Sequence, residues 1–234
     1  MLIAAAAAFL AIHLFVAGTR LRDVITRGIG ERAYLALFSL ASLGVIVWLA
    51  TAYNVARASG DNRVLFNLGR GVHDMGILIV ALAFLVGVQG MMAPNPTSVQ
   101  QESAAAKEGT IKGVLRITRH PFLWGVVLWS GFHLAANGNL ASVIFFGAFF
   151  VLALFGTFSI DAKRRRKLGT AWDAFAAKTS NLPFGAVVTG RNTLNIRESF
   201  GWRFWVALIT FIAVLFAHVH IFGVSPLPGG ATPV

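Results

Sequence analysis

Six long apolar segments divide the chain and constrain its fold more than any other feature. They cover residues 2–18, 33–56, 72–92, 121–136, 140–160 and 202–223. A helix needs about 20 apolar residues to cross the hydrocarbon core of a bilayer. In lipid only helices and closed barrels satisfy their own backbone hydrogen bonds, and long unbroken runs favour helices. The sequence therefore predicts an all-α protein, a polytopic transmembrane bundle of about six spans forming one domain over residues 1–234.

The composition agrees with an integral membrane protein. Only 12% of the residues are charged and the mean hydropathy is +0.71, whereas soluble domains carry about 25% charged residues. The chain has no cysteine, which excludes disulfides, thiolate-bound clusters, covalently attached haem and a cysteine nucleophile. No basic residue precedes Arg20, so we expect the first apolar segment to be a retained span rather than a signal peptide.

The basic residues are distributed as membrane topology requires. Seventeen of the 20 Lys and Arg residues lie in the first, third and fifth loops, and the other three lie in the second loop. The positive-inside rule places the richer loops in the cytoplasm. We therefore expect a bacterial inner-membrane protein with both termini in the periplasm. Because the charge of +11 is concentrated at membrane junctions, we expect no nucleic-acid partner.

A basic amphipathic helix is predicted in the fifth loop. Leu168, Trp172, Phe175 and Ala176 fall on one helical face, and five consecutive basic residues at 163–167 precede them. Such a helix is expected to lie on an anionic inner leaflet. Each basic side chain near the lipid surface contributes about 1 kcal/mol to that contact.

Two histidines inside apolar segments, His13 and His133, are the strongest candidates for function, because ionisable residues within a membrane are rarely present without a role. Neutral imidazole is the commonest metal ligand. Since the chain lacks cysteine and clustered carboxylates, haem held by histidine is the best-matched metal centre. His120 cannot share a metal with His133, because thirteen helical residues separate them by about 20 Å. From spacing alone, His13, His73 and His218 all remain possible partners for His133.

The fourth segment is bounded by two informative motifs. Arg119-His120-Pro121 opens it, with proline in the first helical turn where its missing N–H costs nothing. Asn137-Gly138-Asn139 closes it in a tight turn, so segments four and five should be antiparallel neighbours. We expect Arg119 and His120 to bind haem propionates or lipid phosphate. The phenylalanine-rich fifth segment would suit a flat apolar cofactor or a polyene, although lipid contact explains any single phenylalanine. We expect the protein to bind an apolar or gaseous small ligand.

Motifs along most of the chain resemble the NnrU family of bacterial membrane proteins, which is related to plant 15-cis-zeta-carotene isomerase. Their order and spacing carry the resemblance, more than any one of them alone. The motifs are Ile12-His13, Arg20-Leu21-Arg22-Asp23, Ile29-Gly30-Glu31-Arg32-Ala33, Val72-His73-Asp74, Arg116-Ile117-Thr118-Arg119-His120-Pro121 with Trp129, His133 and Asn137-Gly138, then Leu168-Gly169, Leu182-Pro183-Phe184, Gly190-Arg191 and Ala217-His218.

The resemblance implies a haem b protein whose two axial ligands are His13 and His133. It also implies a link to nitric oxide and denitrification metabolism, or to haem-dependent cis–trans isomerisation of a polyene. Two isomerase features differ here. A histidine expected near Tyr53-Asn54 is missing, and Ser130 stands where the isomerase has cysteine.

Two other functions remain open from the sequence. Arg119-His120-Pro121 is similar to the R-H-P element of membrane methyltransferases that bind S-adenosylmethionine. Those enzymes carry a Glu-Glu pair after the following span, where this chain has Asp161-Ala162-Lys163, which makes methyl transfer the weaker alternative. The third possibility is a structural subunit of a respiratory membrane assembly, with other membrane proteins as partners.

Overall fold

The structure, a computed structural model, describes residues 1–227, and this part of the chain is built from helices. The longer ones are α1 (Leu2–Ala11), α2 (Leu21–Ile29), α3 (Glu31–Arg57), α5 (Gly76–Met92), α7 (Pro121–Ala136), α8 (Leu140–Leu168), α9 (Thr170–Ala177) and α11 (Trp202–Phe222). A π-helix, η1 (Ile12–Ala17), continues α1. Short helical turns form α4 (Arg70–Asp74), η2 (Glu102–Ala106), α6 (Val114–Ile117), α10 (Gly185–Val188) and η3 (Ile196–Ser199). The all-α prediction is confirmed.

Three helices, α3, α8 and α11, are long and apolar enough to cross a membrane. The segment of α1 and η1 qualifies as a fourth when it is joined to α2 across a 72° bend. The remaining two apolar segments form α5 and α7, which are shorter at 17 and 16 residues. Each of the six predicted apolar segments is therefore helical. The observed helices vary in length more than the predicted segments do.

The boundary of the fifth segment differs most from its prediction. We expected it to end at residue 160, where charged residues begin, but α8 continues to Leu168. Lysine, arginine and alanine are good helix formers, so charge does not end a helix. Gly169 ends it, because its φ of +54° lies in a region that glycine adopts without strain. The basic run 163–167 thus belongs to α8 itself.

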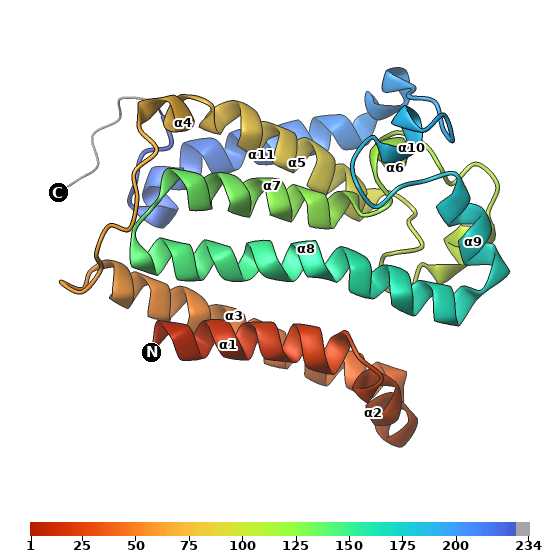
Figure 1. Cartoon of the computed structure of the whole chain (residues 1–234), viewed down its shortest axis with the longest axis horizontal. Helices are drawn as coiled ribbons and strands as arrows, with labels where there is room; N and C mark the ends of the chain where they lie inside the picture. The colour runs from red at the N-terminus through yellow and green to blue at the C-terminus, as the bar shows by residue number, and fades with distance from the viewer. Residues whose placement is uncertain (228–234) are drawn as a thin grey trace.

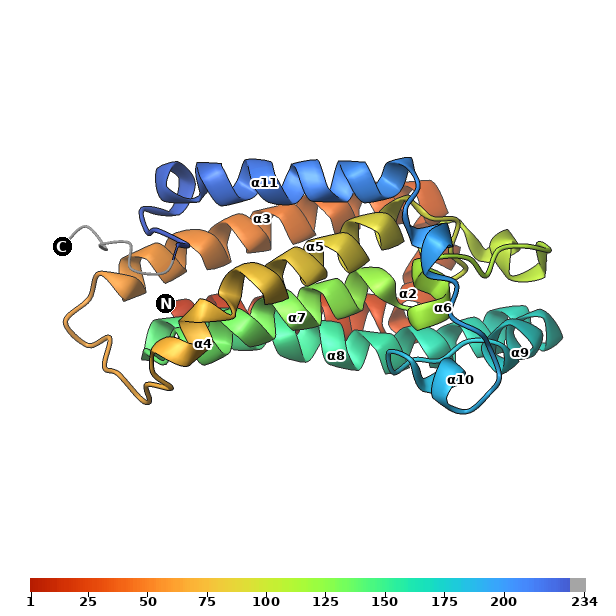
Figure 2. The same cartoon turned by 90° about the horizontal axis from the view of Figure 1, so that it is seen from above.

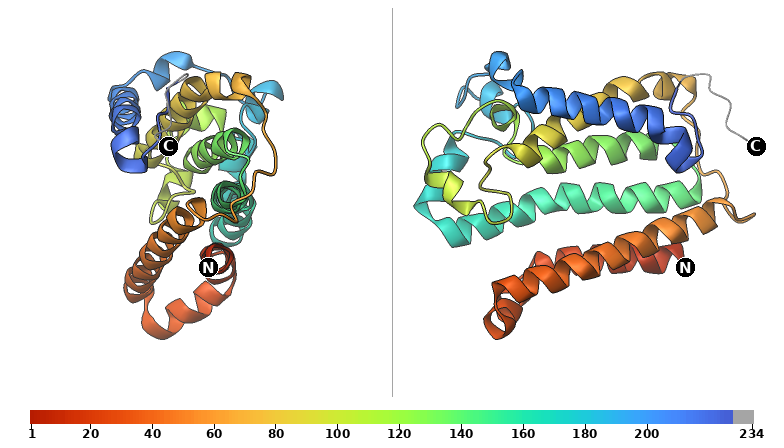
Figure 3. Two further views of the ribbon diagram at one scale, coloured as in Figure 1. Left: turned by 90° about the vertical axis from the view of Figure 1, so that its left-hand side faces the viewer. Right: turned by 180° about the vertical axis from the view of Figure 1, so that it is seen from behind.

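The long helices lie side by side, and α8 is the helix that they share (Figure 1). On one side α8 packs against α1 and α3, and on the other side it packs against α7. α5 covers α7 and α11 covers α5, as the view from above shows (Figure 2). Within residues 1–227, α1 and α3 make no substantial helix contact with α5, α7 or α11. The end-on view shows the resulting two groups of helices (Figure 3, left).

Small residues bring α5 and α7 very close together. A Cβ atom added to Gly125 of α7 would lie 2.7 Å from the carbonyl oxygen of Ala83 and 2.7 Å from the Cα atom of Gly87. One added to Gly90 would lie 2.5 Å from the Pro121 ring. Close approach of backbones at small residues is how helices associate in membranes, where lipid removes the hydrophobic driving force.

The connection between α7 and α8 is the tight turn predicted from Asn137-Gly138-Asn139. The side chain of Asn139 caps α8 by accepting a hydrogen bond from the Ser142 amide at 3.0 Å. The Gly138 carbonyl accepts a hydrogen bond from the Leu65 amide at 2.8 Å, which ties the loop after α3 to the turn. The two helices pack along their length, so the prediction that they are antiparallel neighbours is correct.

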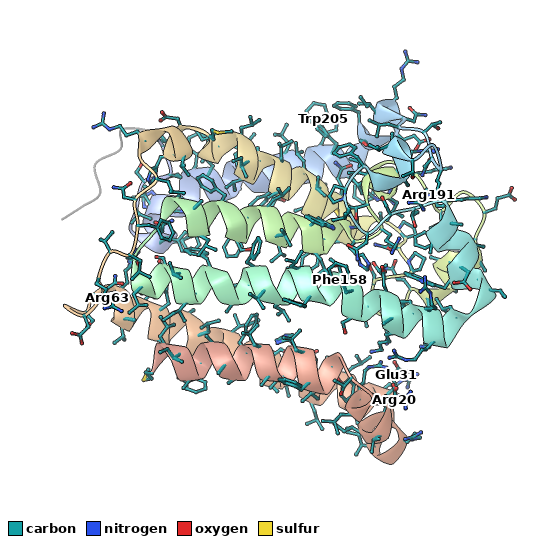
Figure 4. The ribbon with its side chains drawn as sticks, in the orientation of Figure 1. Arg20, Glu31, Arg63, Phe158, Arg191 and Trp205 are labelled. Carbon is teal, nitrogen blue, oxygen red and sulfur yellow. The ribbon has the colours of Figure 1, made fainter. Side chains whose placement is uncertain are left out.

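The two ends of the bundle differ in charge. We call the end that holds α2, α6 and α9 the basic end, and the end that holds residues 137–139 the turn end. Arg20, Glu31 and Arg191 lie at the basic end, whereas Arg63 lies at the turn end (Figure 4). The three loops that carry most of the basic residues therefore gather on one side of the bundle, as the charge pattern predicts.

Candidate functional site

His13 lies in the π-helix η1, where the helix is wider than an α-helix by one residue per turn. Its Nδ1–H donates a hydrogen bond to the Phe9 carbonyl at 2.8 Å. The Ser42 hydroxyl, from α3, lies 3.4 Å from its Nε2 atom. Rings of Phe9 and Phe38 flank the imidazole at centroid distances of 4.8 and 5.5 Å. Single π-helical turns within α-helices occur frequently at functional sites.

His133 lies in the last turns of α7 and is held in the same way. Its Nδ1–H donates to the Trp129 carbonyl at 2.8 Å. Trp129, Phe132 and Phe146 surround its ring at centroid distances of 5.1, 5.4 and 4.8 Å. Because a carbonyl oxygen only accepts, the bond assigns the proton to Nδ1 and leaves a lone pair on Nε2. This is the tautomer and orientation that metal-binding histidines typically show.

A row of aromatic rings connects the two histidines across α8. Phe9 contacts Phe149 at 4.8 Å between centroids, Phe149 contacts Trp129 at 5.6 Å, and Trp129 contacts His133 at 5.1 Å. Counting along the helices from these contacts places His13 roughly 10 Å farther toward the basic end than His133. The two imidazoles thus belong to different helix groups and are joined by ring contacts rather than by direct packing.

The other two candidate partners of His133 lie toward the turn end. His218 donates through Nδ1 to the Val224 carbonyl at 2.9 Å. His73 lines a cavity of about 200 Å³ together with Asn67 and Asn137. Within residues 1–227, no group of three or more His, Asp or Glu side chains is placed to hold a metal ion.

Arg119 and His120 meet at one carboxylate, that of Asp161 on α8. Arg119 Nε donates to both carboxylate oxygens, at 2.9 and 3.0 Å, and its Nη2 pairs with the same group. The Nε2 atom of His120 lies 2.6 Å from Asp161 Oδ1. Asn181 Nδ2 donates to Oδ2 at 3.3 Å. We call these four residues the Asp161 network.

The network is attached to the surrounding loops by backbone bonds. Asn95 and Thr97 both donate to the Arg119 carbonyl at 3.1 Å. The Arg119 amide donates to the Ser180 carbonyl at 2.9 Å, and the guanidinium lies 5.7 Å from the centre of the Trp172 ring. Segments that are distant in sequence, around residues 95, 119, 161 and 180, are thereby joined at the basic end.

His120 is held neutral in this network. Its side chain is fully buried, and burial lowers its pKa below the ordinary value, with Arg119 adding to the effect and Asp161 opposing it. Arg119 already neutralises the Asp161 carboxylate, so a proton on His120 would add an uncompensated buried charge. His120 Nδ1 has no hydrogen-bond partner among the described residues, and a buried N–H there would also be unsatisfied.

These contacts differ from what the sequence suggested for Arg119 and His120. We expected them to bind propionates or phosphate, whereas both side chains are engaged by Asp161 within the protein. Contact with an external anion stays a prediction. Asp161 and Asn181 were missed by the sequence reasoning. A signal for Asp161 existed, because the tight turn at Gly138 fixes the register of α7 and α8 and brings residue 161 opposite residue 120.

The predicted amphipathic helix is present as α9, but it begins at Thr170 and its large apolar residues face the protein. Trp172 is 0% exposed and Phe175 is 3% exposed. α9 packs against η2 and α8, and the Trp172 ring contacts Arg119. Leu168 belongs to α8 instead, because Gly169 separates the two helices. Trp172 and Phe175 therefore pack inside the protein, whereas we had expected the apolar face of this helix to lie against lipid.

The fold and these residues define an all-helical membrane protein with histidines placed among its apolar helices. The chain belongs to the NnrU family: the family described as "NnrU protein" matches residues 1–226. The family predicted from the sequence motifs is thereby confirmed.

Two curated plant proteins are similar to the chain, and both are named 15-cis-zeta-carotene isomerase, chloroplastic. The Zea mays protein is 27% identical over 177 residues, which cover 74% of this chain and 47% of the plant protein. The Arabidopsis thaliana protein is 25% identical over 215 residues, covering 91% and 56%. The chain spans about half the length of these relatives. No solved structure matches the chain.

Proposed function

We propose that this protein binds haem b through His13 and His133 and acts on an apolar or gaseous ligand within the membrane. The observation that carries the proposal is that the two imidazoles have the same surroundings and the same hydrogen bond. Each lies in an apolar helix, and each donates its Nδ1–H to the carbonyl four residues earlier at 2.8 Å. Each Nε2 is thereby left as an acceptor, which is what an iron ligand requires.

In donor chemistry the two imidazoles fit haem iron, although they lie roughly 10 Å apart along the bundle, so binding of one iron by both would require the two helix groups to come closer. Haem b would be held by His13 and His133 and would supply an iron able to bind a small molecule or a double bond. The protein supplies fixed imidazoles and an apolar environment. Phe9, Phe149, Trp129 and Phe146 form apolar ring contacts that run from α1 across α8 to α7, and the backbone bonds hold each imidazole in orientation.

The ligand class follows from the relatives. The two similar proteins are named as isomerases of a carotene, which is a long apolar polyene. We propose a polyene as the substrate and cis–trans isomerisation as the reaction. Nitric oxide is the second candidate ligand, favoured by the link of the NnrU family to denitrification. Both are apolar enough to reach residues buried among membrane helices.

We also propose a bacterial inner-membrane location with the basic end in the cytoplasm. The support is the charge distribution, because 17 of the 20 Lys and Arg residues lie in loops that meet at this end. An anionic leaflet attracts such a cluster. The exposed basic residues of α2 and of the last turns of α8 are suited to contact it.

An absorption spectrum tests the haem proposal. The full chain, purified in mild detergent from haem-sufficient cells, should show a Soret band and sharp α and β bands on reduction with dithionite. His13→Ala and His133→Ala should each lose or shift these bands, because one axial ligand is removed. His220→Ala is the matched control, since this histidine is exposed at the end of α11. A colourless wild-type protein from such cells would contradict the proposal.

The same spectra separate the alternative ligand pairs. If His13 is the partner of His133, the low-spin bands survive His218→Ala and His73→Ala. Loss of the bands in His218→Ala, with His13→Ala unchanged, would identify His218 rather than His13 as the partner of His133.

A further inference from the structure

A cavity of about 410 Å³ opens at the basic end, between the loop at residues 105–111 and the helix α9. It lies outside the Asp161 network and far along the bundle from His133. Its volume is within the range of cavities that hold small organic ligands, about 300–1,000 Å³. Its residues come from segments distant in sequence: the loop before α6, α6 itself, α9 and the loop after α10.

The lining of this cavity is strongly positive. Lys107, Arg116, Lys178 and Arg191 line it, against one carboxylate, Glu108. Arg116 is neutralised by Glu198, to which its Nε donates at 2.7 Å. Within the described chain, the ammonium groups of Lys107 and Lys178 make no hydrogen bond or ion pair. The cavity therefore retains free cationic donors on two facing walls.

Both walls are held in place by contacts with the rest of the protein. On the loop side, Glu102 pairs with Arg164 and Lys167 of α8, and Arg164 donates to the Ser98 carbonyl at 2.7 Å. On the α9 side, Arg191 Nη1 donates to the carbonyls of Ala176, Ala177 and Thr179 at 2.9–3.2 Å. The lysines thus project from segments that are already fixed, which lowers the ordering cost of binding.

The rest of the lining is mixed: the apolar side chains of Ile111, Ala174 and Phe175 lie beside the polar Thr110 and Asn192. A ligand that matches this surface has an anionic group for the lysines and an apolar or flat body for the side chains beside them. Phosphate is the anionic group most consistent with several cationic donors, because it offers charge and several acceptor oxygens at once.

We propose that this cavity binds an organic phosphate, with Lys107 and Lys178 contacting the phosphate group. The phosphate belongs either to a soluble molecule such as a mononucleotide or to the headgroup of an anionic phospholipid. The proposal does not depend on haem, since none of the cavity residues contacts His13 or His133.

Binding to the purified full chain in detergent tests the proposal. The soluble probe is ATP, titrated calorimetrically. For the lipid probe, the protein is reconstituted in neutral nanodiscs and mixed with vesicles of phosphatidylcholine that contain or lack phosphatidylglycerol. The amount of protein that floats with each kind of vesicle measures binding. The double variant Lys107→Glu/Lys178→Glu should weaken the effective probe at least about tenfold, because two charge-assisted contacts become repulsive. Lys107→Gln/Lys178→Gln should weaken it less.

The control double variant is Arg63→Glu/Arg70→Glu, which makes the same change in net charge at exposed residues of the second loop, outside the cavity and away from the basic end. It should bind like the wild type. Selective loss of ATP binding supports a soluble ligand, and selective loss of phosphatidylglycerol binding supports a headgroup. The proposal is overturned if wild-type protein binds neither probe, or if both double variants lose binding equally. Unchanged melting temperatures of the variants exclude unfolding as the cause.

Discussion

Asp161 is the residue on which most of the basic end depends. Its one carboxylate accepts hydrogen bonds from Arg119, His120 and Asn181, and it is the counter-charge of a largely buried guanidinium. Removing one partner of a buried ion pair costs more than the pair contributes, because the remaining charge stays desolvated. The stability of this end should therefore respond strongly to a small change at this position.

Asp161→Asn keeps the size of the side chain and removes its charge. We expect the variant to lose about 3 kcal/mol of stability, since the Arg119 charge is left buried without a counter-charge. Thermal unfolding of the detergent-solubilised protein measures the loss. Asp173→Asn is the control, because this carboxylate is 62% exposed and lies 3.6 Å from Arg165. Equal melting temperatures for the two variants would contradict a structural role for the Asp161 network.

The buried imidazole of His120 predicts a pH dependence of stability. Burial lowers its pKa in the folded protein, whereas the unfolded chain takes up a proton near pH 6.5. The unfolded state then binds more protons below that pH, so stability is full above about pH 6.5 and falls as the pH is lowered. Melting temperatures measured between about pH 7 and pH 5 should decline less in His120→Gln than in the wild type. Parallel curves would show that His120 does not contribute.

At the scale of single residues, the sequence identified candidates but not their contacts. His13 and His133 could be selected because each interrupts an apolar run. Their hydrogen bonds to Phe9 and Trp129 connect residues four apart and follow from the helix itself. The pairing of His120 with Asp161 joins residues 41 apart in sequence, so only the antiparallel register of α7 and α8, and no local pattern, indicates it.

Among the helices, the contact between α5 and α7 has the least room for change. Gly125 packs against the backbone of Ala83 and Gly87, and Gly90 packs against Pro121. Two helices this close interact through backbone atoms, which cannot rotate away as a side chain can. One added methyl group must therefore separate the helices.

Gly125→Ala should lower the melting temperature and the yield of folded protein, although alanine is the better helix former. The added Cβ would lie 2.7 Å from backbone atoms of α5, and overpacking of this kind costs about 1–3 kcal/mol. Gly147→Ala on α8 is the matched control, because its Cβ would meet nothing within 4 Å. It should be neutral or slightly stabilising. A Gly125→Ala variant as stable as Gly147→Ala would show that α5 and α7 separate easily.

Helix positions were predictable and some helix ends were not. Apolar runs locate the six segments because the requirement for buried backbone hydrogen bonds acts on every residue of a span. The end of α8 was missed because hydropathy marks where a span leaves lipid, and a helix can continue beyond that point. The break at Met75 between α4 and α5 has no signal in the apolar pattern.

For the whole molecule, the orientation of the bundle is the property that charge predicts. Because the chain has no cysteine, single cysteines report the location of each end without background. Gly60→Cys at the turn end should react with a membrane-impermeant maleimide in intact cells with a permeable outer membrane. Thr170→Cys at the basic end should react only after lysis. The reverse pattern would place the basic end outside.

The division of the molecule by α8 has a consequence for motion. α1 and α3 contact the other spans mainly through this one helix. At the turn end, Arg57 of α3 also donates a hydrogen bond to the Phe222 carbonyl of α11. A small tilt of that pair against α8 would act as a hinge that leaves every helix intact. Since His13 moves with the pair and His133 does not, such a tilt would change the spacing of the two imidazoles. If the two imidazoles share a ligand as proposed, such a tilt would open and close the position of that ligand without unfolding any span.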